Sequence, residues 1–126
     1  NIPIANDLID AYAISFGLRN VTNIDATLQE AYRVIKPGGK FLCLEFGTVD
    51  SVLLDKLYST YSKKFIPNLG KLVTGEKHAY EYLINSIDTF PHQKILFKKI
   101  EKYGFRKGNF INLFAGIVVL YYAWKI

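Results

Sequence analysis

The sequence contains no methionine and only one cysteine. A single thiol, Cys43, excludes an internal disulfide and a zinc site built from several cysteines. Cys43 lies in an apolar stretch, where a thiol behaves as a small hydrophobic side chain. Such sparse use of cysteine is typical of a reducing compartment, so we expect a cytoplasmic protein.

The chain also lacks a long hydrophobic run. Its longest apolar stretch, Ala115–Trp124, is shorter than the roughly 20 residues that a membrane-spanning helix needs. The opening Asn1-Ile2-Pro3 does not resemble a secretory signal, and it includes no initiator methionine. We therefore expect the sequence to be a piece of a longer protein.

Apolar side chains are plentiful: 50% of the residues are hydrophobic, with 9 Tyr and 9 Phe. That content predicts a packed core and argues against disorder. The net charge of +5 favours acidic partners such as anionic lipid headgroups. A solvated basic surface is the commoner cause of such a balance, and we predict no nucleic-acid partner.

The first half of the chain follows a strand, helix, strand pattern. Ala11–Phe16 predicts a buried strand, and Phe41–Phe46 predicts a second strand that is buried on both faces. Between them a helix begins near Thr22 or Asn23, and residues 37–39, Pro-Gly-Gly, should end it. The apolar residues at helical spacing are Leu28, Ala31, Tyr32 and Ile35. This pattern predicts a crossover between two parallel strands.

The second half begins with helical patterns and ends with strand patterns. Pro91 suits the start of the last helix, and Gly104 suits its end. Phe110–Phe114 and Ile117–Trp124 are rich in β-branched and aromatic residues, which predicts a hairpin. We therefore predict an α/β fold with parallel strands, a helical insertion and a terminal antiparallel hairpin. We expect residues 1–126 to form a single partial domain.

Two stretches identify a family. Residues 14–21 are ISFGLRNV, and residues 32–46 are YRVIKPGGKFLCLEF. Together they closely resemble the ubiquinone/menaquinone biosynthesis C-methyltransferase family, and residues 112–118, NLFAGIV, resemble that family's ending. The resemblance covers essentially the whole chain. It implies the C-terminal part of a Rossmann-like S-adenosylmethionine (SAM) methyltransferase sheet, whose glycine-rich cofactor turn lies upstream of this sequence.

The resemblance also implies an activity. The cofactor would be SAM, and the reaction would be C-methylation of a polyprenyl benzoquinol or demethylmenaquinol. We expect the fragment alone to be inactive. The apolar substrate tail favours peripheral contact with the inner face of a membrane, and unpaired sheet edges are compatible with a homodimer. The alternatives are a non-catalytic remnant, a dimerisation or binding module that needs an upstream half, and an O- or small-molecule methyltransferase of the same fold.

The loop after the first strand carries the implied cofactor and catalytic residues. Ser15 and Phe16 lie at the carboxyl end of that strand, where α/β sheets bind ligands, and the resemblance assigns them to the cofactor. Arg19 and Asn20 follow as implied catalytic residues. A guanidinium would favour the deprotonated form of a quinol oxygen, and an amide would orient it. The structural alternatives are a backbone-bonded Ser15, a surface ion pair for Arg19 and a turn cap for Asn20.

Three further residues are candidates for the substrate side. Glu45 interrupts an apolar strand, so its charge needs a partner. Contact with the substrate and an ion pair with Arg33 or Lys36 are equally open. Tyr58 and Tyr61 lie on one predicted helical face and would line a groove for the polyprenyl tail, although such a face is more often core. We predict no metal site, because the two histidines have no ligand spacing.

Overall fold

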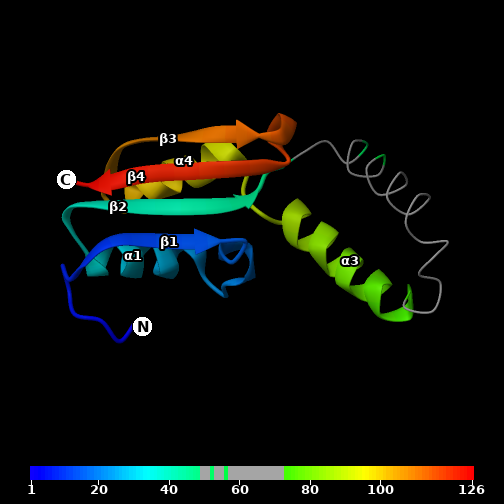
Figure 1. The fold of residues 1–126 in the computed structure, drawn as a ribbon, viewed down its shortest axis with the longest axis horizontal. Helices are drawn as coiled ribbons and strands as arrows, with labels where there is room; N and C mark the ends of the chain where they lie inside the picture. The colour runs from blue at the N-terminus through cyan, green and yellow to red at the C-terminus, as the bar shows by residue number, and fades with distance from the viewer. Residues whose placement is uncertain (49–51, 53–55, 57–72) are drawn as a thin grey trace. The chain divides into compact units, whose positions relative to one another are not determined.

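The computed structural model describes residues 1–48, 52, 56 and 73–126 (Figure 1). The chain forms two compact units, one made of Asn1–Gly47 and Pro91–Ile126 and the other of Thr48–Phe90. The second unit contains helix α3 (Val73–Asp88). The elements of the first unit are β1 (Ile9–Ser15), the 3₁₀ turn η1 (Leu18–Asn20), α1 (Ile24–Val34), β2 (Ile35–Phe46), α4 (Gln93–Lys102), β3 (Phe105–Leu113), the 3₁₀ turn η3 (Phe114–Gly116) and β4 (Val118–Lys125).

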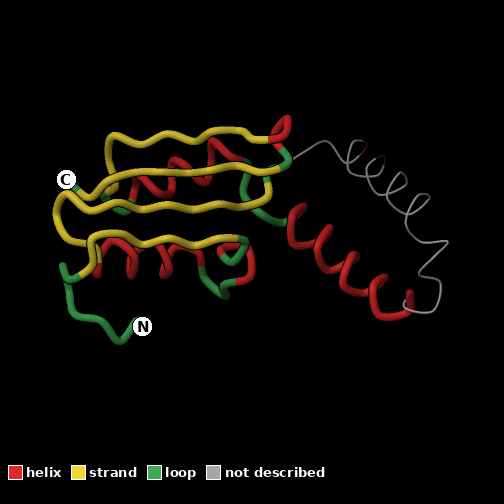
Figure 2. Tube along the Cα trace, in the orientation of Figure 1, coloured by secondary structure: helices red, strands yellow, loops and turns green. Residues whose placement is uncertain are grey.

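The first unit is a four-stranded mixed sheet with the order β1-β2-β4-β3 (Figures 1 and 2). β1 and β2 are parallel, whereas β4 is antiparallel to both β2 and β3. This arrangement confirms the predicted α/β class, the parallel crossover and the terminal hairpin. None of the helices within residues 1–48 and 73–126 is long and apolar enough to cross a membrane.

Helix α1 begins where the sequence predicted and ends earlier. The Asn23 side chain accepts a hydrogen bond from the backbone N–H of Ala26, which caps the first turn. The helix ends at Val34, and Ile35 is already extended. The predicted helix stop at residues 37–39 is therefore wrong, because these residues belong to β2. Gly38 has a φ of 85°, a conformation that glycine adopts without strain, and β1 and β2 change register here.

The core lies on one face of the sheet. Lys99 of α4 and Tyr103, which follows that helix directly, both bond to Asp25 of α1, so the two helices lie side by side (Figure 2). On the sheet face beneath them, Phe41, Cys43 and Glu45 of β2 are buried. Their antiparallel partners on β4, in the same order, are Ala123, Tyr121 and Val119, which are buried too.

The other face of the sheet is only half-buried. Leu42, Leu44 and Phe46 alternate with the buried residues of β2 and remain partly exposed. The prediction that this strand is buried on both faces is therefore wrong for the part of the chain that the structure describes. The alternation itself has a simple cause, because successive side chains of a strand point to opposite faces.

Candidate functional site

The candidate site begins at the carboxyl end of β1, where the chain turns sharply. Phe16 follows the strand with a φ of 50°, in the left-handed region that bulky residues rarely adopt. Its backbone N–H still donates to the carbonyl of Leu44 on β2, at 2.8 Å. The short turn η1 comes next and carries Arg19 and Asn20. The turn therefore places both residues at the edge where ligands bind in parallel α/β sheets.

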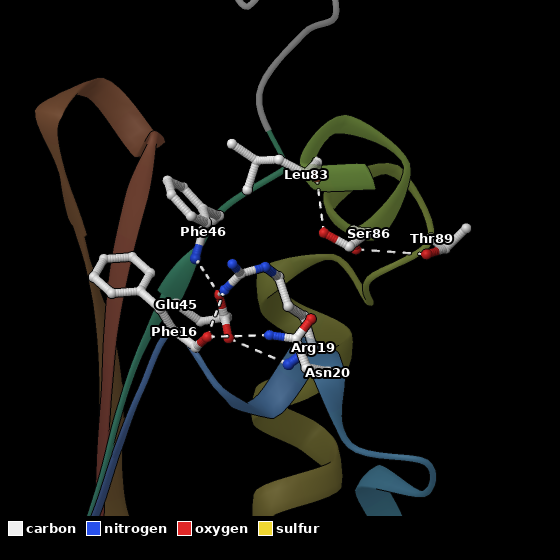
Figure 3. Close-up of polar contacts among 8 residues, drawn as sticks. All are labelled: Phe16, Arg19, Asn20, Glu45, Phe46, Leu83, Ser86 and Thr89. Atoms are coloured by element: carbon white, nitrogen blue, oxygen red, sulfur yellow. Dashed lines mark hydrogen bonds and ion pairs between the residues drawn. The ribbon is translucent and has the colours of Figure 1, made fainter. Parts of the chain in front are cut away.

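Glu45 lies beneath this turn with no exposed surface (Figure 3). Its Oε1 accepts hydrogen bonds from Nη1 of Arg19 at 2.7 Å and from the backbone N–H of Phe46 at 2.9 Å. Its Oε2 accepts from the backbone N–H of Arg19 at 3.2 Å. A buried carboxylate needs such partners, and three donors meet that need. Glu45 thus connects the second strand to the loop that follows the first.

Arg19 is held by contacts at one end of its guanidinium. Nη1 also donates to the carbonyl of Phe16, at 2.8 Å. The guanidinium carbon lies 5.0 Å from the centre of the Phe46 ring, within the range of a cation–π contact. The Phe16 and Phe46 rings lie 4.8 Å apart between centroids. With 11% of its side chain exposed, Arg19 is nearly as buried as its carboxylate partner.

The polar groups behind the ion pair are neutral. Burial, and next the charge of Glu45, raise the pKa of the Cys43 thiol to about 12. Burial likewise raises the pKa of Tyr121, with smaller contributions from Cys43 and Glu45. The Tyr121 hydroxyl is buried and has no hydrogen-bond partner among the residues described. Glu45 and Arg19 therefore sit at the edge of a region of low polarity, where charge interactions are strong.

Ser15 and Asn20 are on the exposed side of the same turn. Ser15 is the last residue of β1 and is exposed. Asn20 is also exposed, and its Nδ2 donates to the carbonyl of Phe16 at 3.4 Å. The carbonyl of Phe16 thus accepts from both implied catalytic side chains. Because Ser15 and Asn20 are exposed, a ligand at the carboxyl end of β1 could contact either side chain.

The structure brings together five of the predicted site residues, namely Ser15, Phe16, Arg19, Asn20 and Glu45. Figure 3 shows Phe16, Arg19, Asn20 and Glu45. Tyr58 and Tyr61 lie outside the described residues.

The partner of Glu45 is Arg19, and the two partners suggested by the sequence are engaged elsewhere. Arg33 pairs with Glu30 at 2.8 Å, and Lys36 pairs with Asp10 at 2.9 Å.

Phe46 was not among the predicted site residues, yet its ring contacts both Phe16 and Arg19. Its position beside Glu45 at the carboxyl end of β2 is the signal that would have placed it at the same edge of the sheet.

Within residues 1–48 and 73–126, no group of three histidine, cysteine or acidic side chains is arranged to hold a metal ion.

The sequence profile of the ubiE/COQ5 methyltransferase family matches residues 1–125 of the chain. The chain belongs to this family. Curated members of the family include the ubiquinone/menaquinone biosynthesis C-methyltransferase UbiE of Brucella canis, which is 47% identical over 125 residues. The protein of the same name from Brucella anthropi is 48% identical. The alignments cover 99% of this chain but 46% and 48% of the two relatives, so the chain spans about half of their length.

Solved structures show the same fold at low identity. A SAM-dependent methyltransferase from Thermotoga maritima superposes with a TM-score of 0.67 at 16% identity, covering 100% of this chain and 60% of that one. Human N-acetylserotonin methyltransferase in complex with SAM gives a TM-score of 0.54 at 20% identity, covering 95% of this chain and 31% of that one. These matches confirm the predicted Rossmann-like class. Both solved structures are methyltransferases that use SAM, in agreement with the predicted cofactor.

Proposed function

We propose that this chain is part of a SAM-dependent methyltransferase that methylates a ring carbon of a polyprenyl benzoquinol or demethylmenaquinol. The observation that carries the proposal is the position of Arg19, which Glu45 and Phe46 hold at the carboxyl end of β1. Membership of the family supports the general reaction. The substrate class comes from the names of the curated relatives.

Methylation at a ring carbon requires an electron-rich ring. The quinol oxygen gives up its proton, its electrons flow into the ring, and the ring carbon forms the new bond to the methyl group. Bound SAM would supply that methyl group from a sulfonium centre, whose sulfur–methyl bond would break to leave a neutral thioether. The carbon that accepts the methyl group then loses its hydrogen as a proton, which restores the aromatic ring. Arg19 remains protonated throughout, so it would act by stabilising the negative oxygen and not as a base.

The other residues of the turn fit supporting roles. Exposed Ser15, and Phe16 beside it, would contact the cofactor, since they end a parallel strand at the ligand-binding edge. Asn20 would orient the quinol oxygen or a bridging water. The Nε–H of Arg19 has no acceptor within the described part of the chain, and this feature favours an anionic group beside the guanidinium. Tyr58 and Tyr61 would line the path of the polyprenyl tail.

Two assays test the proposal. The first is isothermal titration of the chain with SAM, for which we expect no micromolar binding, because the chain has no glycine-rich cofactor turn. The second uses a hybrid protein in which this chain replaces the matching part of the Brucella canis relative. Radioactive methyl transfer to demethylated quinols, and none to catechols, is the expected result. A folded hybrid that binds SAM but leaves every quinol unmodified would contradict the proposed function.

A binding module is the second candidate, and the half-buried face of the sheet favours it. Leu42, Leu44 and Phe46 on β2, together with Leu120 and Tyr122 on β4, leave apolar surface for another partner within this unit. An analytical ultracentrifugation series would separate the two candidates. A stable homodimer of the chain, together with an inactive hybrid, would favour the module.

Location follows from the proposed substrate. A polyprenyl quinol resides in a membrane, so the protein would work from the cytoplasm in peripheral contact with the membrane surface. The net charge of +5 is compatible with anionic lipids there. Sedimentation with vesicles that contain anionic lipid, compared with neutral vesicles, tests this contact.

A further inference from the structure

The guanidinium of Arg19 has two edges, and the structure uses them differently. Nη1 donates to the carboxylate of Glu45 and to the carbonyl of Phe16. Nε is buried and has no hydrogen-bond partner among the residues described. Nη2 makes no hydrogen bond within the same residues, so the protein supplies no acceptor there to the edge formed by Nε and Nη2. These two nitrogens present parallel N–H groups, the arrangement that arginine uses to bind two anionic oxygens at once.

An unpartnered buried donor is expensive. A buried N–H without an acceptor loses its hydrogen bonds to water and gains none in return, so native structures contain few of them. A purely structural pair would avoid this cost, because arginine and a carboxylate commonly bond through both prongs of the fork. Here Glu45 takes Nη1 alone, and its second oxygen bonds to the Arg19 backbone. The contact geometry therefore leaves this edge of the fork without an acceptor among the residues described.

Glu45 accepts hydrogen bonds from both the side chain and the backbone of Arg19. Its Oε1 holds the tip of the side chain, and its Oε2 holds the backbone N–H at the base. Glu45 is itself fixed, because it lies on β2, an inner strand of the sheet, opposite buried Val119. The Phe46 ring restricts the plane of the guanidinium from one side. Few orientations of Arg19 satisfy all of these contacts.

We infer that Glu45 is a positioning residue: it holds Nη1 of Arg19 so that the guanidinium turns its unpaired edge, through Nη2, toward the deprotonated oxygen of the quinol. This inference rests on the proposed function and adds to it the residue that orients the charge. Glu45 does not touch the substrate in this arrangement, since it has no exposed surface. A buried ion pair is weak grounds for stability by itself, because well-packed apolar residues often replace it without loss. Orientation of a charge is a role that apolar residues do not supply.

The test compares Glu45→Gln with Arg19→Lys and with a matched control. Glu45→Gln keeps the shape of the side chain but weakens its hold on Nη1. Arg19→Lys keeps a positive charge for Glu45 but removes the fork. Glu30→Gln is the control, because it breaks the Glu30–Arg33 pair, which has the same contact distance within 0.1 Å and lies outside the site.

Two measurements are made on each variant. In the chain itself, NMR follows hydrogen exchange at Nε of Arg19, and we expect slow exchange that Glu45→Gln accelerates about tenfold or more. In the hybrid protein, Glu45→Gln and Arg19→Lys should each lower kcat about 10- to 100-fold, on the scale of losing one preorganised donor. The KM for SAM should change less than about threefold, because the cofactor contacts remain. Glu30→Gln should leave both kcat and the Arg19 signal unchanged.

The double variant Glu45→Gln/Arg19→Lys decides whether Glu45 acts through Arg19. We expect it to be no more than about threefold slower than Arg19→Lys alone, since residues that act as a unit are not additive. Fully additive losses, or a kcat of folded Glu45→Gln within about threefold of the parent, would overturn the inference. Should Glu45→Gln fail to fold, Arg19→Lys remains decisive, because undiminished turnover without the fork would refute it.

The design separates this inference from the proposed function. If the unmodified hybrid folds and binds SAM but methylates no quinol, the proposed function is wrong, and the exchange of the Arg19 Nε–H alone decides the positioning role. If the hybrid is active and Glu45→Gln changes neither readout, the proposed function stands and the positioning role is wrong.

Discussion

Nζ of Lys99 lies 2.7 Å from Oδ2 of Asp25, although the two residues are 74 positions apart in the sequence. Asp25 is in the first turn of α1, and Lys99 is near the end of α4. The Tyr103 hydroxyl donates to the other oxygen of the same carboxylate at 2.9 Å. The Asp25 carboxylate thus links α1 to α4 through an ion pair with Lys99 and a hydrogen bond from the Tyr103 phenol. Each end also complements its helix dipole, with an anion at the start of α1 and a cation at the end of α4.

Asp25→Asn should therefore lower the thermal stability of the chain. Lys99 first and Tyr103 second lower the pKa of Asp25, so the charged form is the one that the fold prefers. Differential scanning calorimetry at neutral pH should record a lower Tm. Tyr103→Phe is the comparison, and it should have a smaller effect because it keeps the ion pair. An unchanged Tm in Asp25→Asn would show that the contact is screened by solvent.

The free energy of unfolding should fall at acidic pH because the Glu30 carboxylate becomes protonated. The hydrogen bond from Arg33, with help from the backbone N–H of Ile2, lowers the pKa of Glu30 to about 2 from 4.5. Because the folded pKa is the lower one, the stabilisation is complete above pH 4.5 and is lost as the pH falls towards 2. Urea unfolding between pH 6 and about pH 2 measures this loss. In Glu30→Gln the slope over that window should be shallower; equal slopes in the two proteins would assign the loss to other carboxyls.

Ala115→Gly should stabilise the chain. Ala115 has a φ of 56° in the hairpin turn, and the left-handed conformation costs an L-residue about 1–2 kcal/mol. Glycine removes this strain and loses part of the gain to unfolded-state entropy, so we expect a net gain of about 1 kcal/mol in the free energy of unfolding. Ala13→Gly in β1 is the control, and it should destabilise by about 0.5–1 kcal/mol. Guanidinium chloride titration of both variants gives the sign directly, and destabilisation by Ala115→Gly would contradict the prediction.

The thiol of Cys43 should be inert in the folded chain. With a pKa of about 12 and no exposed surface, almost no thiolate is present at neutral pH. Modification by Ellman's reagent should therefore follow the rate of unfolding and become rapid only in denaturant. Rapid labelling of the native chain would mean that the face of the sheet beneath α1 and α4 opens readily.

Arg19→Ala should affect both activity and stability. In the hybrid protein we expect turnover to fall by about 100-fold or more, as for the loss of a preorganised donor. In the chain itself the variant leaves Glu45 buried without its cation, which should cost about 3–5 kcal/mol. Glu45→Leu added to Arg19→Ala should recover much of that stability but none of the activity. A loss of turnover below about threefold in the folded single variant would remove Arg19 from the mechanism.

Local sequence determined the secondary structure of the first unit and its topology. Three features act over short distances and could be predicted from the sequence alone. They are the Asn23 cap, the helical spacing of Leu28 and Ala31 and the apolar run of residues 41–46. The helix end was misplaced because proline and glycine stop a helix and also permit a bulge in a strand. Only pairing with β1 distinguishes these two uses.

The family motifs likewise placed Ser15, Arg19 and Asn20 on one loop, since neighbours in sequence stay neighbours in space. What the tertiary structure decided was the partner of each charge. Glu45 had Arg33 and Lys36 within easy reach along the chain, yet it bonds Arg19, which is 26 residues away. That choice depends on the parallel pairing of β1 with β2 and on the left-handed turn at Phe16. Together they place Arg19 next to the Glu45 carboxylate, which is buried and therefore not solvated by water. Burial and long-range pairing are properties of the whole fold, and no short segment of sequence records them.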